Sequence, residues 1–468
     1  MNLETNNKNL EKGITLVIPN PCGNIKETKM KNSGVEWIGE IPEDWEISKT
    51  KYLTKLYTGN SIKDEEKNLY EDKADAVPYI SSKDINATFS TTNYENGMYV
   101  KHSDNSFVRA PAGSTLMCIE GGSAGKKKTF LNQEVCFVNK LCCFSPIKID
   151  SKFLFYCLNS PNYEEEFRFN ISGMIGGVSV GKLNQFILPL PPKETQQRIA
   201  SYLDKKCSKI EETIQNQQQV IEKLKAYKQS LITEAVTGKV KIENGKACGE
   251  YESYKDSGVE WIGRIPSGWE IKKLKYIADS FSKGSGITKE EIVINGDTPC
   301  VRYGELYTKY DYHFTECQTR TNLGIIETPK YFSHGDVLFT CTGELVEEIG
   351  KSIAYLGNEK CLAGGDIIVL KHSQDPMFMG FALDSKYVQG QKSFGKTKLK
   401  VVHISSGEIA RLLIVLPPKE EQKEIADYLD KKCTAIDTAI EQKQKLIEKL
   451  TEYKKSLIYE CVTGKKEI

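Results

Sequence analysis

The sequence is poor in the residues that most enzymes use for catalysis. It has only five histidines among its 468 residues, and none of them belongs to a metal-binding or nucleophile motif. Its 14 cysteines include no C-x-x-C pair, which argues against zinc sites and favours free thiols in a reducing compartment. The apolar runs are far shorter than a membrane span, and the polar start (MNLETNNKNLEKG) has no signal-peptide apolar region. We therefore expect a cytoplasmic protein without a metal site of its own.

Nucleotide-binding and catalytic motifs are missing as well. The segment Gly121–Lys126 fails the P-loop pattern because Glu120 and Lys127 stand at positions that require glycine and Ser/Thr. Gly350–Ser352 has the correct end, but Leu345 occupies the place of the first glycine. No amino-methyltransferase or nuclease motif is recognisable. We therefore expect no catalytic residues and no bound cofactor in this chain.

Positive and negative charges are also nearly balanced, since the formal net charge is only +1. A protein that binds nucleic acid through bulk electrostatics would be strongly basic. Any contact with DNA must therefore use local patches, or partners that supply further cations.

What the sequence does contain is an internal repeat. Ser33–Leu53 (SGVEWIGEIPEDWEISKTKYL) recurs as Ser257–Ile277 (SGVEWIGRIPSGWEIKKLKYI). Leu190–Lys239 recurs as Leu416–Lys465, with more than half of the positions identical. The long stretches between these matched segments barely resemble each other. A chain that repeats its framework and varies the inserted parts is suited to hold two different readers at a fixed separation.

The repeat predicts two halves, each with a globular mixed α/β domain followed by a long helix, related by a pseudo-two-fold axis. Residues 1–29 match nothing in the second half, and Met30 stands where the repeat begins, so we expect a loosely ordered extension and an alternative start. The predicted parts are the extension 1–29, a first globular domain 30–189, a first conserved helix 190–240, a linker 241–256, a second globular domain 257–415 and a second conserved helix 416–468.

The conserved helices are predicted over Glu194–Ala235 and Glu420–Cys461. A proline pair precedes each of them and Thr-Gly follows, and neither proline nor glycine occurs between. Apolar residues alternate at spacings of three and four, as in a coiled coil, and the polar positions Gln217 and Lys443 recur at the same place. The short linker favours an antiparallel pair, whereas the alternative is that each helix packs on its own domain. The predicted seam consists of Leu203, Ile210, Ile214, Ile221, Leu224, Leu231, Leu429, Ile436, Ile440, Ile447, Leu450 and Leu457.

Short apolar runs in the globular parts indicate strands, and two aromatic-rich stretches indicate helices. The expected strand segments are Ala76–Ile80, Ser114–Ile119, Glu134–Phe144, Asp336–Cys341 and Asp366–Leu370. The expected helical stretches lie near Lys152–Leu158 and Met377–Val388.

Two corresponding loops place lysines beside glycines, where backbone amides and ammonium groups can approach phosphates together. These loops are Gly121–Lys128 and Gly343–Ser352, and the basic segment Gln389–Lys400 is a further candidate. The alternative is that these lysines are solvated surface charges. The candidate phosphate contacts are Lys126, Lys127, Lys128, Lys351, Lys392, Lys396 and Lys398.

Two further corresponding segments, Pro78–Ile85 and Pro299–Leu306, each read as a strand that runs into a polar turn. Arg302 could make a bidentate contact to guanine there. The alternative is a capped strand end with surface polar residues. The candidate contacts to base edges or phosphates are Ser81, Ser82, Lys83, Arg302 and Tyr303.

The four tryptophans fall at matching places in the two copies, within the pattern W-I-G-x-I-P-x-x-W. We expect Trp37, Trp45, Trp261 and Trp269 to anchor the start of each domain to the helices rather than to stack on bases.

From about residue 30 to residue 468 the chain resembles the specificity subunit of type I restriction-modification systems. The resemblance rests on the duplicated SGVEWIG-x-IP-x-x-W entrance, the turn after Pro78 and Pro299, the stretch from Gly335 to Lys351, and the exits into the helices at Gln196 and Gln422. Gly113-Ser114 departs from the Gly335-Asp336 of the second copy, and the extension is unusual.

The resemblance implies two target-recognition domains that each read half of a split, asymmetric double-stranded DNA sequence, separated by an antiparallel coiled coil. It also implies two methyltransferase subunits docked on this framework and two nuclease-translocase subunits in the full complex. S-adenosylmethionine, ATP and Mg²⁺ would bind those partners. The competing hypotheses are a coiled-coil scaffold that assembles proteins without reading DNA, and a catalytic nuclease or methyltransferase.

Overall fold

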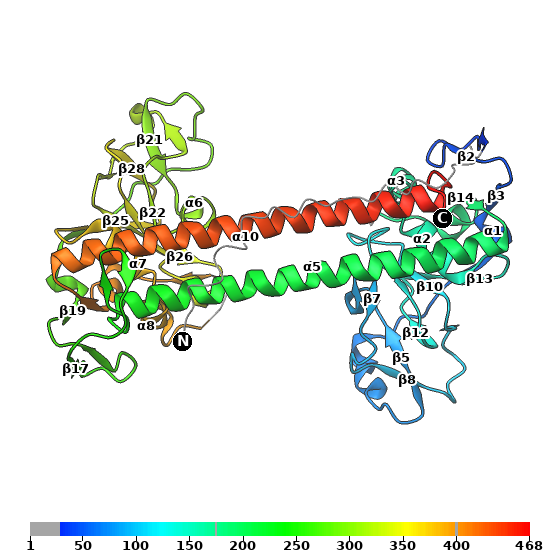
Figure 1. Ribbon diagram of the computed structural model, residues 1–468, viewed down its shortest axis with the longest axis horizontal. Coiled ribbons are helices and arrows are strands. Elements are labelled where there is room, and N and C mark those ends of the chain that lie inside the picture. The colour runs from blue at the N-terminus through cyan, green and yellow to red at the C-terminus, as the bar shows by residue number, and fades with distance from the viewer. Residues whose placement is uncertain (1–28, 174–175, 398–400) are drawn as a thin grey trace. The chain divides into compact units, whose positions relative to one another are not determined.

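The structure is a computed structural model that describes residues 29–173, 176–397 and 401–468 (Figure 1). The chain divides into two units, Met1–Gln215 with Ile447–Ile468, and Asn216–Leu446. Each unit combines one globular domain with segments of two long helices. The predicted extension lies outside the described residues, apart from Lys29.

The two long helices are α5 (Lys193–Val236) and α10 (Lys419–Val462). Both predictions are confirmed, and each helix extends one residue further at both ends. Proline occupies the position just before each helix, and the glycines that follow have the positive φ that ends a helix, 71° at Gly238 and 72° at Gly464. All twelve predicted seam residues are buried or half-buried. Leu203 and Leu429 are completely buried.

The first globular domain contains two four-stranded sheets. One has the strand order β11-β10-β13-β4 and the other the order β8-β5-β12-β9. In the second sheet, β5 and β12 run parallel while the other neighbours are antiparallel. The strands are β4 (Thr54–Thr58), β5 (Ala76–Ile80), β8 (Tyr99–Lys101), β9 (Arg109–Ala110), β10 (Thr115–Cys118), β11 (Lys128–Phe130), β12 (Val135–Phe137) and β13 (Leu141–Pro146), and the helices are α1 (Thr50–Leu53), α2 (Ser151–Leu158), α3 (Pro161–Phe169) and α4 (Val180–Leu183).

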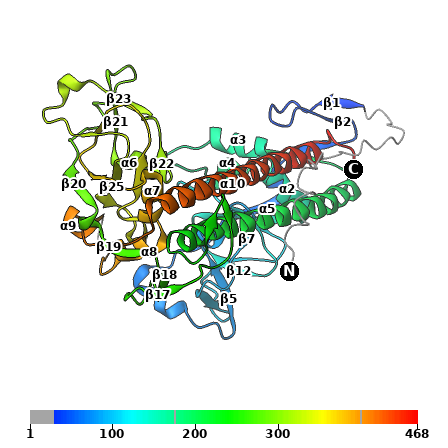
Figure 2. The same ribbon diagram turned by 60° about the vertical axis from the view of Figure 1, so that its left-hand side comes forward.

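The second globular domain also contains two sheets. Figure 2 shows this domain, with α6, β20, β21 and β25 labelled. Its larger sheet has the order β20-β29-β25-β27-β22, and its smaller sheet has the order β23-β21-β28-β24 with β21 and β28 parallel. The strands are β20 (Ala278–Lys283), β21 (Thr298–Val301), β22 (His313–Phe314), β23 (Thr319–Thr321), β24 (Tyr331–Phe332), β25 (Val337–Thr340), β27 (Ser352–Tyr355), β28 (Cys361–Ala363) and β29 (Ile367–His372), and the helices are α6 (Tyr303–Thr308), α7 (Pro376–Leu383), α8 (Lys386–Ser393) and α9 (Ser406–Ile409).

The two variable regions therefore share one topology although their sequences barely match. In its larger sheet the second domain has one added strand, β22, which pairs in parallel with β27. The predicted strands at Ala76–Ile80, Ser114–Ile119, Asp336–Cys341 and Asp366–Leu370 and the predicted helix at Lys152–Leu158 are all present.

Two of the predicted segments are wrong as single elements. Glu134–Phe144 divides into β12 and β13, because the chain turns at Asn139 and Lys140 between them. Met377–Val388 divides into α7 and α8, because Asp384 ends the first helix and Ser385 precedes the second.

Each domain is framed by a strand pair, in which one strand lies in a repeated segment and the other ends where the next repeated segment begins. In the first copy β3 (Glu46–Lys49) pairs with β14 (Ile187–Leu190), and in the second β19 (Glu270–Lys273) pairs with β31 (Leu413–Leu416). Before them lie the hairpins β1 (Met30–Asn32) with β2 (Glu40–Pro42), and β17 (Tyr254–Asp256) with β18 (Arg264–Pro266). The variable parts are thus inserted between two antiparallel framework strands.

The domain entrances are fastened to the ends of the long helices. A Cβ atom at Gly464 would lie 2.4 Å from Cδ of Pro42 and 3.2 Å from Trp45, and one at Gly238 would lie 2.3 Å from Cδ of Pro266 and 3.0 Å from Trp269. Only glycine fits this close approach at a positive φ. Trp45 and Trp269 are buried, as expected for anchors.

The other two tryptophans differ from each other. Trp37 is buried and packs edge-on against Tyr163 of α3, with ring centroids 6.0 Å apart. Trp261 is 58 % exposed, so the prediction that it is an anchor is wrong.

The predicted linker contains structure of its own. Its residues include the short strand pair β15 (Ile242–Glu243) with β16 (Lys246–Ala247), and Ile242 is buried. Lys239, just before it, donates to the carbonyl oxygens of Ile262 and Arg264 at 2.9 and 2.8 Å. In the first unit Lys465 donates to the carbonyl oxygen of Ile38 at 2.7 Å, which is the equivalent contact.

Some chemical features can be stated for the described residues only. Their cysteines are unpaired, and all but Cys248 and Cys317 are buried. Within the same residues, no group of three or more His, Cys, Asp or Glu side chains could hold a metal ion. Among the described helices, none combines the length and the apolar composition that a membrane crossing requires.

Candidate nucleic-acid interface

A capped turn follows the parallel strand pair of each domain. In the first domain the backbone N–H of Ser81, just after β5, donates to Oδ2 of Asp84 at 2.8 Å. In the second domain the backbone N–H of Arg302, just after β21, donates to Oε2 of Glu305 at 2.9 Å. The two turns are therefore built in the same way, and different side chains occupy their first position.

The acidic residues hold these turns through several hydrogen bonds. Asp84 and Glu305 are both buried. The hydroxyl of Ser81 donates to Asp84 at 2.6 Å. Glu305 accepts from Thr319 at 2.9 Å and pairs with Lys309 at 2.6 Å. Buried carboxylates need such partners, so both are structural groups.

The two predicted DNA-contact segments of each domain meet in space. In the first domain the ammonium group of Lys127 donates to the carbonyl oxygen of Ser82 at 2.6 Å. In the second domain the hydroxyl of Tyr307 in α6, one residue after the predicted segment, donates to the carbonyl oxygen of Glu348 at 3.3 Å. The strand-end turn and the glycine-containing loop thus lie next to each other in each domain.

The candidate residues differ in how far they are exposed to solvent. Lys83, Lys126 and Tyr303 are exposed, Ser81, Ser82, Lys127, Arg302, Lys351 and Lys396 are half-buried, and Lys398 lies outside the described residues. The hydroxyl of Ser81 and the ammonium of Lys127 are already bonded within the domain, as given above. Their contact with DNA stays a prediction.

Two predicted phosphate contacts are wrong because their side chains are buried. Lys128 is 1 % exposed, pairs with Glu164 at 2.6 Å and donates to the carbonyl oxygen of Leu158 at 2.8 Å. Burial lowers the pKa of Lys128. Lys392, also 1 % exposed, donates to the carbonyl oxygen of Gly350 at 2.6 Å. A fully enclosed ammonium group cannot reach a phosphate.

Two other lysines have partners within the protein. Lys351 donates to the carbonyl oxygen of Tyr310 at 2.8 Å. Lys396 donates to the carbonyl oxygen of His403 at 2.6 Å and pairs with Glu408 at 2.8 Å. The second domain therefore uses these two lysines, together with Lys392, to fasten its own loops.

Lys392 gives a pH prediction. Burial lowers its pKa to about 8, partly offset by the nearby Asp384 carboxylate, against about 10.4 in an unfolded chain. Between these values the folded chain has released the proton and the unfolded chain has kept it, so the free energy of unfolding rises with pH. Relative to Lys392→Met, the wild type should gain about 3 kcal/mol over this window. Urea unfolding at a series of pH values measures the difference, and parallel curves for the two proteins would contradict the prediction.

The sequence reasoning missed how each domain holds its helix. Asp204 of α5 accepts from the hydroxyl of Tyr156 at 2.7 Å and pairs with Lys152 at 3.3 Å. The equivalent Asp430 of α10 lies 2.8 Å from Nε2 of His313. An aspartate that is identical in both copies of the framework was the available signal.

A pair of buried glutamines makes a second such contact. Oε1 of Gln196 accepts from the backbone N–H of Asp150 at 2.8 Å, and Nε2 donates to the carbonyl oxygen of Pro191 at 2.8 Å. Gln422 makes the same two bonds to Asp375 and Pro417, each within 3.0 Å. The glutamine noticed at each exit therefore links the start of the long helix to the N-cap of α2 or α7.

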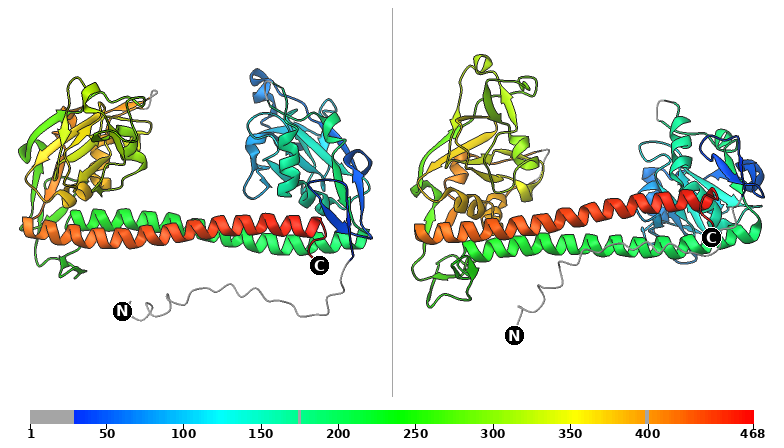
Figure 3. Two further views of the ribbon diagram at one scale, coloured as in Figure 1. Left: turned by 90° about the horizontal axis from the view of Figure 1, so that it is seen from above. Right: turned by 45° about the horizontal axis from the view of Figure 1, so that its top comes forward.

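Within each unit, segments of α5 and α10 lie side by side (Figure 1 and Figure 3). In the first unit Glu211 pairs with Lys454 at 2.5 Å, and in the second Lys228 pairs with Asp437 at 2.7 Å. These are equivalent pairs in the repeat. Lys443 donates to Gln217 at 3.1 Å across a sequence separation of 226 residues, which is the repeat offset.

Comparisons with known proteins agree with this architecture. The family model of the type I restriction modification DNA specificity domain matches residues 42–225 and 266–451. The chain is 24 % identical over 449 residues to the type I restriction enzyme MjaVIII specificity subunit of Methanocaldococcus jannaschii, covering 91 % of this chain and 93 % of the relative. It is 22 % identical over 441 residues to the EcoKI specificity subunit of Escherichia coli K12, covering 91 % and 90 %.

A solved structure shares the fold. A chain from a structural study of the assembly and conformational transition of a type I restriction-modification system aligns with a TM-score of 0.66 and 15 % identity, covering 91 % of this chain and 99 % of that chain. The two matched segments of the family model together span most of the sequence. The chain therefore belongs to the type I restriction modification DNA specificity domain family and carries two copies of that domain.

Proposed function

We propose that this chain is the sequence-specific DNA-recognition subunit of a type I restriction-modification complex, in which each globular domain reads one half of a split double-stranded target. The observation that carries the proposal is the repeated domain plan with different residues on the same capped turn, Ser81 in one copy and Arg302 in the other. Readers of unlike half-sites need a constant scaffold and variable contacts to base edges.

We further propose that α5 and α10 form an antiparallel coiled coil that sets the distance between the half-sites. The pairs Glu211–Lys454 and Lys228–Asp437 support this antiparallel direction, because a residue further along α5 pairs with a residue nearer the start of α10. The buried seam residues support knobs-into-holes packing. Each helix has 44 residues and would be about 65 Å long, enough to separate half-sites one DNA turn, about 34 Å, apart.

The proposed partners are two methyltransferase subunits that dock on this framework and, in the restricting complex, two nuclease-translocase subunits. We propose that the chemistry belongs to them, so that S-adenosylmethionine, ATP and Mg²⁺ bind the partners and this chain is not catalytic. The names of the relatives as specificity subunits of type I restriction enzymes support this division. The complex would act on DNA in the cytoplasm.

A net charge of +1 fits this role. Non-specific affinity for DNA comes mainly from phosphate neutralisation by lysine and arginine. A nearly neutral subunit would bind DNA weakly alone and more tightly when its partners add phosphate contacts.

The test is to purify the full chain with its cognate methyltransferase subunit and map the methylated positions on genomic DNA. We expect methylation confined to one bipartite sequence with a constant spacer. Methylation without sequence preference would instead indicate a scaffold that only assembles the partners. Methylation or cleavage by this chain alone would indicate an enzyme.

A further inference from the structure

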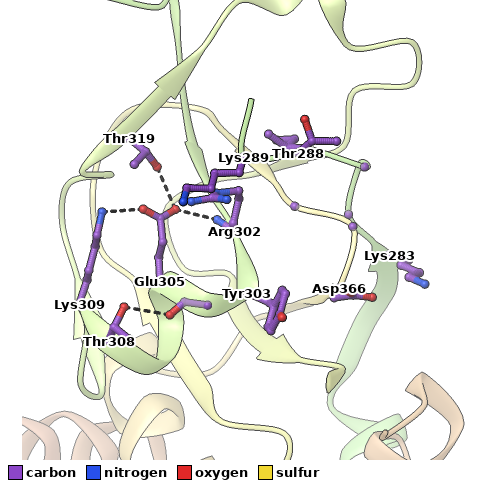
Figure 4. A pocket seen from close by; sticks show the side chains of 16 residues that line it. Lys283, Thr288, Lys289, Arg302, Tyr303, Glu305, Thr308, Lys309, Thr319 and Asp366 are labelled. Carbon is purple, nitrogen blue, oxygen red and sulfur yellow. Dashed lines mark hydrogen bonds and ion pairs between the residues drawn. The ribbon is translucent and has the colours of Figure 1, made fainter. Parts of the chain in front are cut away.

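A cavity of about 960 Å³ opens beside the capped turn of the second domain (Figure 4). Its wall comes from four places in the sequence: the end of β20 and the loop after it, the Arg302 turn with α6, Thr319 of β23, and Gly364–Asp366 after β28. Backbone forms much of this wall. A Cβ atom at Gly284 would lie 2.1 Å from the carbonyl oxygen of Gly364, so the strands can approach this closely only without a side chain there.

The cavity carries a positive charge. Four basic side chains and two acidic ones line it, namely Lys283, Lys289, Arg302, Lys309, Glu305 and Asp366. Glu305 is already occupied by Lys309, Thr319 and the turn backbone. The basic groups that remain can therefore bind a ligand rich in hydrogen-bond acceptors.

Arg302 is the unusual group in this wall. Its Nε atom is buried without a hydrogen-bond partner. In the part of the chain that the structure describes, three arginines are half-buried. Arg109 pairs with Glu134, and Arg320 donates to the carbonyl oxygen of Gly296, but the guanidinium of Arg302 has no partner. Leaving a buried donor unsatisfied costs free energy, so the placement of Arg302 in this wall calls for an explanation other than stability.

The position of Arg302 distinguishes base recognition from a phosphate contact. It stands at the first position of the turn that both domains share, where the first domain has Ser81. Two readers of the same DNA backbone have no reason to differ in a phosphate contact, but readers of different sequences must differ in base contacts. The hydroxyl of Ser81 is also tied to Asp84, so the first domain presents no comparable donor there.

We propose that Arg302 is a specificity-determining residue that reads a guanine in the half-site of the second domain, through paired hydrogen bonds from its guanidinium to O6 and N7. The proposal rests on the proposed DNA-reading function. A guanidinium is a rigid planar fork that matches two adjacent acceptors. The turn fixes the backbone of Arg302, and its buried Nε limits the directions in which the fork can point. The same chemistry would also fit a phosphate, and the experiment separates the two.

The experiment compares Arg302→Ser with the wild type, each as the full chain assembled with the methyltransferase subunit. Serine is the residue at the equivalent turn of the first domain, so the turn tolerates it. Binding is measured for duplexes that carry each of the four bases at every position of the two half-sites. We expect the variant to lose about 10- to 100-fold of its preference for guanine at one position of the second half-site, with the first half-site unchanged.

Two matched variants complete the design. Arg302→Lys keeps the charge and removes the fork, and we expect the same loss of preference at the same position. Lys289→Ala removes an exposed cation from the rim of the cavity, and we expect it to weaken all duplexes equally. If Arg302→Ser instead weakened binding to all duplexes equally, and Arg302→Lys restored the binding, Arg302 would be a phosphate contact and the proposal would be overturned.

A second half-site without guanine in the wild-type target, or an unchanged preference in Arg302→Ser, would also overturn the proposal. These outcomes differ from failure of the proposed function, in which the wild-type complex itself shows no sequence preference.

Discussion

Exchanging residues 54–186 for the corresponding segment of another family member is expected to change one half of the recognised sequence completely and to leave the other half intact. The segment contains the two sheets of the first domain and two core clusters of buried residues, whose members all lie between Tyr57 and Cys143. It therefore brings these two clusters with it. The framework strands β3 and β14 lie outside the exchanged segment.

Mapping of methylated sites in a host that expresses the chimera with the methyltransferase subunit measures this result. The matched control is an exchange of the equivalent segment of the second domain, residues 278–412, which should change only the other half. A chimera that alters both halves at once would show that the two domains do not read independently.

Removing one heptad from both long helices is the second change with a large expected effect. Deleting Gln217–Lys223 together with Lys443–Lys449 removes equivalent segments. The pairs Glu211–Lys454 and Lys228–Asp437 keep their register on either side of the cut. The proposed rod shortens by about 10 Å, or about three base pairs of DNA. We expect a spacer shorter by that amount or, where the DNA cannot meet both readers, loss of methylation.

The measurement is methylation of a library of targets whose half-sites are separated by spacers of every length. Deleting the heptad from α5 alone is the matched control, because Glu211–Lys454 and Lys228–Asp437 cannot then form together, and we expect this variant not to assemble. An active double deletion with an unchanged spacer would rule out the helices as the element that sets the distance.

The framework was predictable from the sequence because its signals are local. Proline before each helix, glycine after it and a heptad pattern between them are read from neighbouring residues, and they predicted α5 and α10 to within one residue at each end. The repeat supplied much of the rest of the plan, since the contacts of Gln196, Gly464, Lys465 and Glu211 in one unit have equivalents in the other.

The candidate interface was less predictable because burial depends on residues that are distant in the sequence. Lys128 follows two other lysines and looks like part of a surface run, yet Glu164 and the end of α2 enclose it. Lys392 lies in a basic segment, yet the carbonyl oxygen of Gly350 and the hydroxyl of Ser352 accept its protons. The common topology of the two domains was also not predictable, because their sequences barely match. A sheet order depends on the pattern of apolar residues, and this pattern can persist when the residues themselves change.

The contacts of Gln196 and Asp204, repeated at Gln422 and Asp430, have a consequence for the history of such chains. They form the same binding site for a globular domain on each helix, and any newly acquired domain must carry the groups that bind to it. These groups are an aspartate that caps the helix equivalent to α2 or α7, as Asp150 and Asp375 do, and a nearby side chain that reaches Asp204 or Asp430. A domain acquired by recombination can then join the existing long helices without changes in them. Domains that lack these groups should be absent from natural recombinant chains.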